Sequence, residues 1–508
     1  MLETADAPRK LSKRAYADAV DALRVELINL QYDVAHSSRA VIITVAGDDR
    51  LSVVEAVDVL SEWMDTRYLP VRAFGLPSAR DREHPWQWRY WEALPGKGEM
   101  ALFAATSLPA PIRGAFSGRL DDEHFASAVS KGVEFEATLA EDGVTMIKLW
   151  LHLPGHAAAE HLDQFFGDHP DPDAHLDERD RLMLERRDEI EPVVDRYLRA
   201  TSGPGREWLV IDASKHRHRD LAVAEAVRDG LRAALDGDGD DTETSGLPSA
   251  AAASAEAWSR AQRMPDGPQR LADVDLSATV DYDAYRDELE VLQRRLRNLW
   301  TLASGELRMK VVLVFEGWDA AGKGGVIRRV HRPLRAGTYL VVPIAAPTEH
   351  ELAHHYLWRF WTRLPRPSKM TIFDRSWYGR VLVERVEGFA TEAAWRRAYS
   401  EIRSFEQQQV DHGTVLAKFW LHIDADEQLR RFEAREETPY KKYKITTEDY
   451  RNRSRWDDYV LAADEMFAET STLAAPWTLV AANDKRAARL TVLRTVCDRL
   501  EAGVTAHL

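Results

Sequence analysis

The sequence has 508 residues, of which 45% are hydrophobic and 30% charged, so it can build two or more folded domains and does not have the composition of a disordered chain. The formal net charge of −15 argues against general affinity for nucleic acid, and no run of eighteen uncharged apolar residues predicts a membrane span. The single cysteine, Cys497, excludes an intrachain disulfide and favours a reducing compartment, so we expect a cytoplasmic protein.

The first half of the chain recurs in the second half at a constant spacing. WRYW at 88–91 returns as WRFW at 358–361, a shift of 270 residues. The same shift aligns KLWLH at 148–152 with KFWLH at 418–422, and no gap is needed between these two matches. A gapless repeat of this length predicts two tandem copies of one fold.

A stretch rich in Gly, Asp, Ser and Ala separates the copies and predicts a flexible linker over residues 236–257. We therefore expect a first domain over 1–235 and a second over 258–508.

Within the second copy, short apolar runs alternate with longer helical segments. The runs lie at 310–315, 338–344, 369–373, 418–423 and 477–481, and the helical segments include 392–411 and 448–470. This alternation predicts an α/β fold in which each copy has a mostly parallel sheet flanked by helices. In such sheets, ligands bind at the carboxyl ends of the strands.

One of these strand ends carries a glycine loop, FEGWDAAGKGG at 315–325. The order of strand, loop and helix, together with the spacing of Gly317, Gly322 and Lys323, predicts the phosphate-binding loop of a P-loop kinase-like fold. The hydroxyl residue that usually follows the lysine and holds Mg²⁺ is replaced by Gly324.

Two carboxylates can compensate for the missing hydroxyl group. Asp319 lies within the loop, and Asp374 ends the predicted strand at 369–373, which faces the same crevice. Hard oxygen ligands of this kind suit Mg²⁺, with Mn²⁺ as an alternative. For Asp374, capping of the helix that follows is the structural alternative.

A basic and aromatic segment, residues 438–459, follows later in the second copy. Thr446 and Asp449 resemble a capping box, and Arg451 and Arg455 share one face of the helix that it would start. The segment predicts a helical lid that closes over phosphates. The alternative is a solvated surface whose bases pair with neighbouring acids.

The first copy lacks the reactive groups. The shift of 270 places Ser52 and Val53 opposite Gly322 and Lys323, and Ala104 and Ala105 opposite Asp374 and Arg375, although Gly47 and Asp49 still match Gly317 and Asp319. A core needs only volume and pattern, whereas phosphate chemistry needs particular charges, so we expect an inactive first copy.

The second copy resembles the family 2 polyphosphate kinases. The resemblance is carried by GWDAAGKGG, APTEHE at 346–351, LWRFWTRLP at 357–365, FDRSWYGRVLVERVEGF at 373–389, PYKKYKITTEDY and PWTLVAANDKRAAR at 476–489. The fused arrangement with an impaired first copy resembles the class that phosphorylates AMP to ADP with polyphosphate as donor.

The resemblance implies a catalytic centre of Asp319, Lys323, Asp374 and Arg375, with Asp319 and Asp374 as metal ligands. It further implies a larger set of positions that contact phosphate or substrate: Gly317, Ala320, Ala321, Gly322, Gly324, Gly325, Arg335, Arg380, Arg435, Lys441 and Lys444.

The predicted function is Mg²⁺-dependent transfer of the terminal phosphoryl group of inorganic polyphosphate to AMP, which gives ADP. The predicted partners are polyphosphate and AMP or ADP, with neither nucleic acid nor a membrane, and self-association stays open. Three alternatives also stay open: phosphorylation of nucleoside diphosphates, an ATP-dependent nucleotide kinase, and a polyphosphate-binding protein without turnover.

Overall fold

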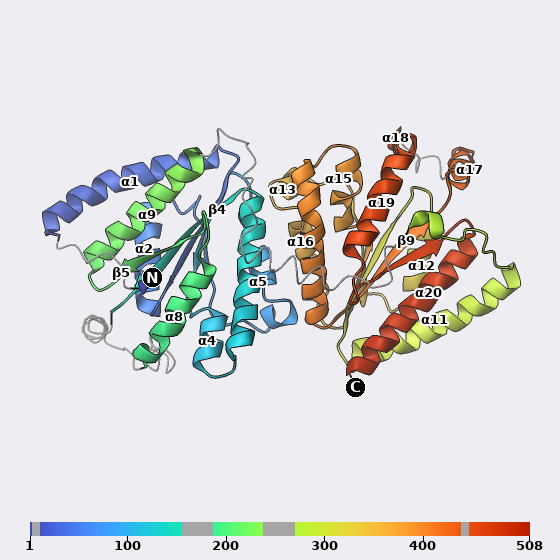
Figure 1. Cartoon of the computed structure of the whole chain (residues 1–508), viewed down its shortest axis with the longest axis horizontal. Coiled ribbons are helices and arrows are strands. Elements are labelled where there is room, and N and C mark those ends of the chain that lie inside the picture. Colours follow the sequence, from blue (N-terminus) through green and yellow to red (C-terminus); the bar gives the residue numbers. More distant parts are fainter. Residues whose placement is uncertain (3–10, 155–185, 237–269, 438–446, 508) are drawn as a thin grey trace. The chain divides into compact units, whose positions relative to one another are not determined.

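The structure, a computed structural model, describes residues 1–2, 11–154, 186–236, 270–437 and 447–507. The chain divides into two compact units (Figure 1). Unit 1 consists of residues 1–78, 89–255 and 349–355, and unit 2 of residues 79–88, 256–348 and 356–508. Each unit therefore includes a short segment from the other half of the sequence. Residues 237–257 of the predicted linker lie outside the described residues, and Asp236 ends α9 (His216–Asp236).

Unit 1 is built on a five-stranded parallel sheet with the strand order β2-β3-β1-β4-β5. Its strands are β1 (Ala40–Gly47), β2 (Val71–Ala73), β3 (Met100–Ala104), β4 (Val144–His152) and β5 (Trp208–Asp212). β1 and β3 are almost wholly buried, as expected of parallel strands that are covered on both faces.

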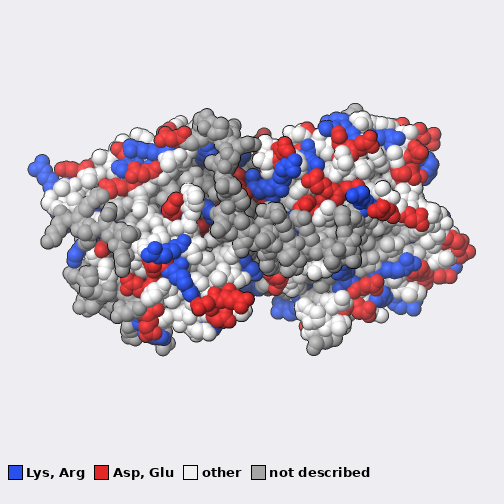
Figure 2. All heavy atoms as spheres, in the orientation of Figure 1, with Lys and Arg blue, Asp and Glu red and all other residues white. Residues whose placement is uncertain are grey.

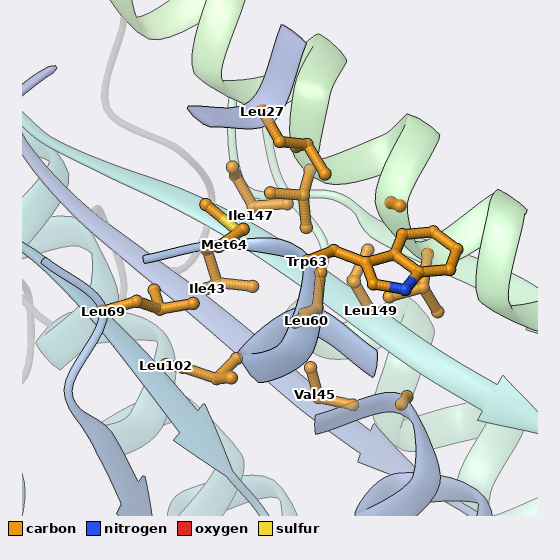
Figure 3. Close-up of a cluster of buried hydrophobic side chains, with 14 of the residues drawn as sticks. Leu27, Ile43, Val45, Leu60, Trp63, Met64, Leu69, Leu102, Ile147 and Leu149 are labelled. Carbon is orange, nitrogen blue, oxygen red and sulfur yellow. The ribbon is translucent and has the colours of Figure 1, made fainter. Parts of the chain in front are cut away.

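Helices cover both faces of this sheet (Figure 1). One group comprises α1 (Lys13–Ala35), α2 (Arg50–Trp63) and α9 (His216–Asp236), and the other comprises α4 (Ala110–Phe116), α5 (Asp122–Glu141) and α8 (Arg187–Thr201). Under the first group, side chains such as Leu27, Ile43, Leu60 and Leu149 interdigitate in one core (Figure 3). Trp150 points to the opposite face, where a second core contains Trp208 and α8.

Unit 2 repeats this sheet in the order β7-β8-β6-β9-β10. Its strands are β6 (Lys310–Gly317), β7 (Tyr339–Pro343), β8 (Lys369–Asp374), β9 (Thr414–His422) and β10 (Trp477–Ala481). The register also repeats, because Val41 pairs with Met100 in unit 1 and Val311 with Met370 in unit 2. The predicted tandem α/β fold with parallel sheets is thus confirmed.

Several helices of unit 2 also form two groups. α11 (Tyr282–Gly305), α12 (Lys323–His331) and α20 (Lys485–His507) pack together, as do α15 (Val383–Val386), α16 (Glu392–Asp411) and α19 (Trp456–Thr470). Unit 2 also contains α17 (Ala425–Glu436), α18 (Thr447–Ser454) and the short α14 (Trp358–Trp361), whereas the short α13 (Glu349–Leu352) and most of α3 (Trp88–Trp91) belong to unit 1. The single helix predicted at 448–470 is thus two helices, α18 and α19.

Both units contain the same buried ion pair beneath the sheet. In unit 1, Lys148 Nζ donates to Glu136 (2.7 Å) and to the carbonyl of Thr201 (2.8 Å). In unit 2, Lys418 Nζ donates in the same way to Glu406 (2.7 Å) and to the carbonyl of the last residue of α19 (2.8 Å). The repeat therefore includes polar interactions of the core as well as its apolar pattern.

Within the described residues, no helix is long and apolar enough to cross a membrane. On the face shown in Figure 2, Lys and Arg side chains are interspersed with Asp and Glu. No broad basic region is visible on this face.

Candidate active site

The glycine loop connects the end of β6 to the start of α12, and two of its glycines are required by the backbone. Gly317 has φ +132°, and a Cβ at this position would lie 2.4 Å from the carbonyl oxygen of Leu421. Gly322 has φ +108° and stands at the N-cap of α12, where it offers no side chain to the first N–H groups of the helix. These N–H groups and the positive end of the helix dipole form a site suited to an anion.

Lys323, the first residue of α12, folds back over the loop. Its Nζ donates to the carbonyls of Gly317 (2.6 Å) and Trp318 (3.1 Å). Burial lowers the pKa of Lys323 from its usual value, although Asp319 and Asp374 oppose this effect. A phosphate on the loop would offer the ammonium group charged acceptors in place of these carbonyls.

The Asp319 carboxylate accepts hydrogen bonds from two other residues of the site. Its Oδ1 accepts from Arg375 Nη2 (2.8 Å) and its Oδ2 from Asn452 Nδ2 (3.1 Å). Burial by itself raises the pKa of Asp319, but Lys323, Arg375 and Asn452 outweigh it and hold the pKa below its usual value. The Asp319 carboxylate is therefore ionised and held in place at neutral pH.

Asp374 ends β8 in register with Phe315 of β6, next to the loop. Its carboxylate makes no hydrogen bond to any other residue that the structure describes. Beside it lies Glu316, which is 5% exposed and accepts from Ser376 Oγ (2.7 Å). Burial raises the pKa of Glu316 above its usual value, even though the Ser376 hydrogen bond opposes the rise. Of these two acids, Asp374 is thus the one with oxygens free for a ligand.

The donor set fits a divalent ion that arrives with phosphate. Asp319 and Asp374 supply hard carboxylate oxygens at the ends of neighbouring strands. No group of three or more His, Cys, Asp or Glu residues that could hold a metal occurs in the described part of the chain. Mg²⁺ commonly keeps several waters and takes one or two protein carboxylates together with phosphate oxygens, so two aspartates suffice.

A buried arginine that the sequence did not single out fixes the loop. Arg431 on α17 is 3% exposed, and its Nη1 donates to the carbonyls of Ala320 (3.0 Å) and Ala321 (2.9 Å). Its Nη2 donates to the carbonyls of Ala482 (2.6 Å) and Asn483 (2.9 Å) after β10. These bonds hold the carbonyls of the loop toward Arg431, and Ala320 adopts φ +65° in this arrangement.

At the predicted lid, α18 and the start of α19 contact the loop through residues other than those predicted. The Trp456 ring stacks on Trp318 with centroids 3.7 Å apart, and Asn452 reaches Asp319. Arg451 forms an ion pair with Glu387 (3.0 Å), whose side chain is 8% exposed. Arg455 pairs with Asp458 (3.1 Å), so the alternative of pairing with neighbouring acids describes this arginine.

The remaining predicted phosphate contacts are dispersed. Gly324 and Gly325 lie in the first turn of α12, whereas the exposed Arg335 follows the other end of that helix. Arg380 pairs with Glu384 (3.1 Å), and Arg435 lies in the last turn of α17. The other two predicted contacts, Lys441 and Lys444, fall outside the described residues.

The equivalent loop of unit 1 is closed. α2 begins at Arg50, three residues before the position that matches Lys323, and Asp49 caps it by accepting from the Ser52 N–H (2.8 Å). Val53 is 1% exposed in the core. A carboxylate therefore occupies the end of the helix at which unit 2 leaves room for an anion.

A family model described as Polyphosphate kinase 2 (PPK2) matches residues 10–237 and 279–507. The chain belongs to the polyphosphate kinase 2 family. Two relatives are named polyphosphate:AMP phosphotransferase: one from Pseudomonas aeruginosa is 41% identical and covers 99% of both chains, and one from Pseudomonas syringae pv. tomato is 40% identical and covers 99% of this chain and 98% of its own.

A crystal structure of a putative polyphosphate kinase 2 from Pseudomonas aeruginosa PA01 matches with a TM-score of 0.84 at 40% identity. It covers 99% of both chains. The tandem arrangement of two kinase-like copies is thus shared with a solved structure over the full length, and the resemblance inferred from the motifs is confirmed.

Proposed function

We propose that the chain transfers the terminal phosphoryl group of inorganic polyphosphate to AMP. An oxygen of the AMP phosphate attacks the terminal phosphorus, and the bridging bond from that phosphorus to the rest of the chain breaks. The products are ADP and a polyphosphate that is shorter by one phosphate. The acceptor oxygen is already ionised near neutral pH, so no strong general base is required.

The observation that carries this proposal is the set of groups at the end of β6 and β8. A helix N-terminus without a side-chain cap, the ammonium of Lys323 and the carboxylate of Asp374 lie around one loop. Polyphosphate kinase 2 relatives that match along the whole chain are named polyphosphate:AMP phosphotransferases, which supports AMP as acceptor.

The site residues have two roles, which are to position the phosphates and to neutralise their charge. The N–H groups of α12 and Lys323 hold the phosphoryl group that is transferred. Arg375, fixed by Asp319, adds positive charge. A bound Mg²⁺ would neutralise charge that develops on the phosphate oxygens, with Asp319 and Asp374 as its protein ligands. Asn452 and Trp456 connect this site to the helices above it, so closure there would exclude water.

In our proposal, the first copy does not bind or transfer phosphate. Glu55 stands where the second copy has Gly325, at the shift of 270. Asp220 stands where it has Arg489, at the shift of 269 that aligns Trp208 of β5 with Trp477 of β10. Both carboxylates bind Arg219, and Asp220 also accepts from Tyr16 (3.0 Å). The region is thus filled by an internal ion-pair network with two acids, which would repel a phosphate chain.

The test is incubation of the full chain with Mg²⁺, polyphosphate and AMP, with the product nucleotides separated by chromatography. We expect ADP without any ATP supplied. Binding of polyphosphate without ADP formation would contradict the proposal and favour a binding protein, whereas product from ADP but not from AMP would favour a nucleoside diphosphate kinase. A requirement for ATP would identify an ordinary nucleotide kinase.

A further inference from the structure

The carboxylate of Glu406, on α16, is buried in unit 2 and has no part in the proposed mechanism so far. The residue is 2% exposed, and its Oε2 accepts from Lys418 (2.7 Å) in the ion pair that both units contain. Its Oε1 accepts two further hydrogen bonds, from Trp377 Nε1 (3.0 Å) and from Tyr378 Oη (2.6 Å). Lys418 Nζ also donates to Tyr378 Oη (2.8 Å). The ion pair thus holds two residues of the turn that follows β8.

The backbone of this turn has an uncommon conformation. Arg375 has φ +64°, a left-handed value that is unfavourable for a residue with a Cβ and persists only where the surrounding contacts determine it. Here the Arg375 N–H donates to the carbonyl of Phe315 (2.9 Å), and Ser376 Oγ donates to Glu316 (2.7 Å). The next two side chains, which donate to Glu406, are at most 1% exposed. Three consecutive side chains therefore anchor the turn to buried carboxylates.

Unit 1 keeps the ion pair but has none of these anchors. Lys148 forms the equivalent pair with Glu136 (2.7 Å). The shift of 270 places the sequence Thr-Ser-Leu, residues 106–108, opposite the three anchoring side chains. Ala105, which stands opposite Arg375, does not have a positive φ. The left-handed turn and its anchors therefore occur together, in the copy that has the phosphate site.

The turn carries both reactive residues at the end of β8. Asp374 lies beside the glycine loop, and Arg375 Nη2 donates to Asp319 of that loop (2.8 Å). A charged group that neutralises a transition state must be placed accurately, since a displacement of about 1 Å can lower the rate by about 100-fold. The contacts that fix the turn therefore bear directly on turnover.

We propose that Glu406 is a positioning residue for phosphoryl transfer, which acts through Trp377 and Tyr378. It fixes the turn so that Asp374 is placed to hold Mg²⁺ and Arg375 is placed to contact phosphate. This inference rests on the proposed function. It gives the buried ion pair of unit 2 a role in turnover in addition to the stability that the pair provides in both units.

The test uses Tyr378→Phe, which removes one hydroxyl group from the turn and leaves the ring and the ion pair of Glu406 in place. We expect kcat for ADP formation to fall by roughly 10- to 150-fold, because the turn loses a hydrogen bond to a charged group. The Mg²⁺ concentration for half-maximal binding of tripolyphosphate, measured by titration calorimetry without AMP, should rise by about 10-fold. Binding without Mg²⁺, which depends on Lys323 and α12, should stay within about twofold.

Two controls separate positioning from a general loss of stability. Tyr399→Phe removes a buried hydroxyl group from the same helix as Glu406, where Tyr399 Oη accepts from Arg385 Nη1 (2.9 Å), and should leave kcat and the Mg²⁺ requirement unchanged. Glu136→Gln disrupts the equivalent ion pair of unit 1 and should lower stability without changing kcat. Glu406→Gln, at a temperature at which circular dichroism shows a folded chain, should change kcat in the same direction as Tyr378→Phe.

A double-variant cycle tests whether Tyr378 acts through Asp374. In the Asp374→Asn background, Tyr378→Phe should lower kcat by a smaller factor than in the wild-type chain, because the carboxylate that it positions is absent. Equal factors in the two backgrounds, or a wild-type kcat for Tyr378→Phe, would overturn the positioning role. If the wild-type chain formed no ADP, the proposed function would fail. An unchanged Mg²⁺ requirement for tripolyphosphate binding in Tyr378→Phe would then overturn the positioning role separately.

Discussion

In unit 1, two residues separate β1 from α2, and in unit 2 five residues separate β6 from α12. The strands before these connections have the same register with their neighbours, so the difference begins at the loop itself. Asp49 uses its carboxylate to close the end of α2, whereas the matching Asp319 turns toward Arg375 and Asn452. The same residue type therefore caps a helix in one copy and serves an open anion site in the other.

This contrast shows which features of a repeat persist when chemistry does not require them. The pairs Lys148 with Glu136 and Lys418 with Glu406 are kept in both units, because a buried charge without its partner destabilises the fold. Lys323, Asp374 and Arg375 of the phosphate site have no counterparts of the same type in unit 1, because Val53, Ala104 and Ala105 stand at the matching positions. Each copy therefore keeps the residues that stabilise its fold, whether or not it has the residues that bind phosphate.

The largest expected effect is that of removing a predicted metal ligand. Asp374→Asn should lower kcat by at least about 100-fold, because phosphoryl transfer depends on charge neutralisation in the transition state. Asp49→Asn should leave the rate within about twofold, since asparagine also caps helices. The measurement is the steady-state rate of ADP formation for both variants. Comparable losses would show that the first copy also takes part in catalysis.

The shared ion pair predicts a loss of stability in both copies. Lys418→Met should lower the free energy of unfolding of unit 2 by about 3–5 kcal/mol, because Glu406 would be left buried and unpaired. Lys148→Met should cost less in unit 1, since the Glu136 side chain is 22% exposed and that of Glu406 only 2%. Scanning calorimetry of the full chain checks both values. Equal losses, or a larger loss for Lys148→Met, would mean that the exposure of the glutamates does not determine the loss of stability.

The contact from α18 to the loop predicts a smaller effect on turnover. Asn452→Ala removes one hydrogen bond to the charged Asp319, so kcat/KM should fall by roughly 10- to 150-fold, which corresponds to about 1.5–3 kcal/mol. Ser454→Ala on the same helix, which loses only a bond to the Arg451 carbonyl, is the control. If both variants kept wild-type kinetics, the helix would have no part in assembling the site.

Separation of the two copies should lower the stability of unit 2 by a smaller amount. A fragment of residues 258–508 lacks residues 79–88, which belong to unit 2. Within that unit, the buried Lys310 donates to the Glu83 carbonyl (3.1 Å) and the His412 carbonyl (2.9 Å). Loss of one acceptor should lower the free energy of unfolding by about 1–3 kcal/mol. A fragment that is as stable and as active as the full chain would contradict a structural role for the first copy.

The fold could be predicted from the sequence because its signals are local and occur twice. The runs at 310–315 and 477–481 coincide with β6 and β10, and the gapless repeat extends the same order of strands to the first copy. The glycine loop was also predictable, since Gly317 and Gly322 both adopt positive φ and tolerate no side chain there without strain.

Other parts of the site depend on contacts between residues far apart in the sequence. Arg431 lies in ADEQLRRFEARE, where nothing distinguishes it from Arg430, yet of these two arginines only Arg431 donates to the carbonyls of Ala320 and Ala321. Arg451 was predicted to belong to a basic lid face, but Glu387, which it pairs with, comes from a distant helix end. Asn452 carries no motif at all, so its bond to Asp319 could not be predicted.

The most direct measurement of whether only one copy binds phosphate is the binding stoichiometry of the full chain. Titration calorimetry with tripolyphosphate in the presence of Mg²⁺ should give one site per chain, and Lys323→Met should abolish it. Val53, at the equivalent position, lies in the core and should contribute nothing to this binding. Two sites of similar affinity per chain, or one site that survives Lys323→Met, would contradict an active second copy beside a closed first copy.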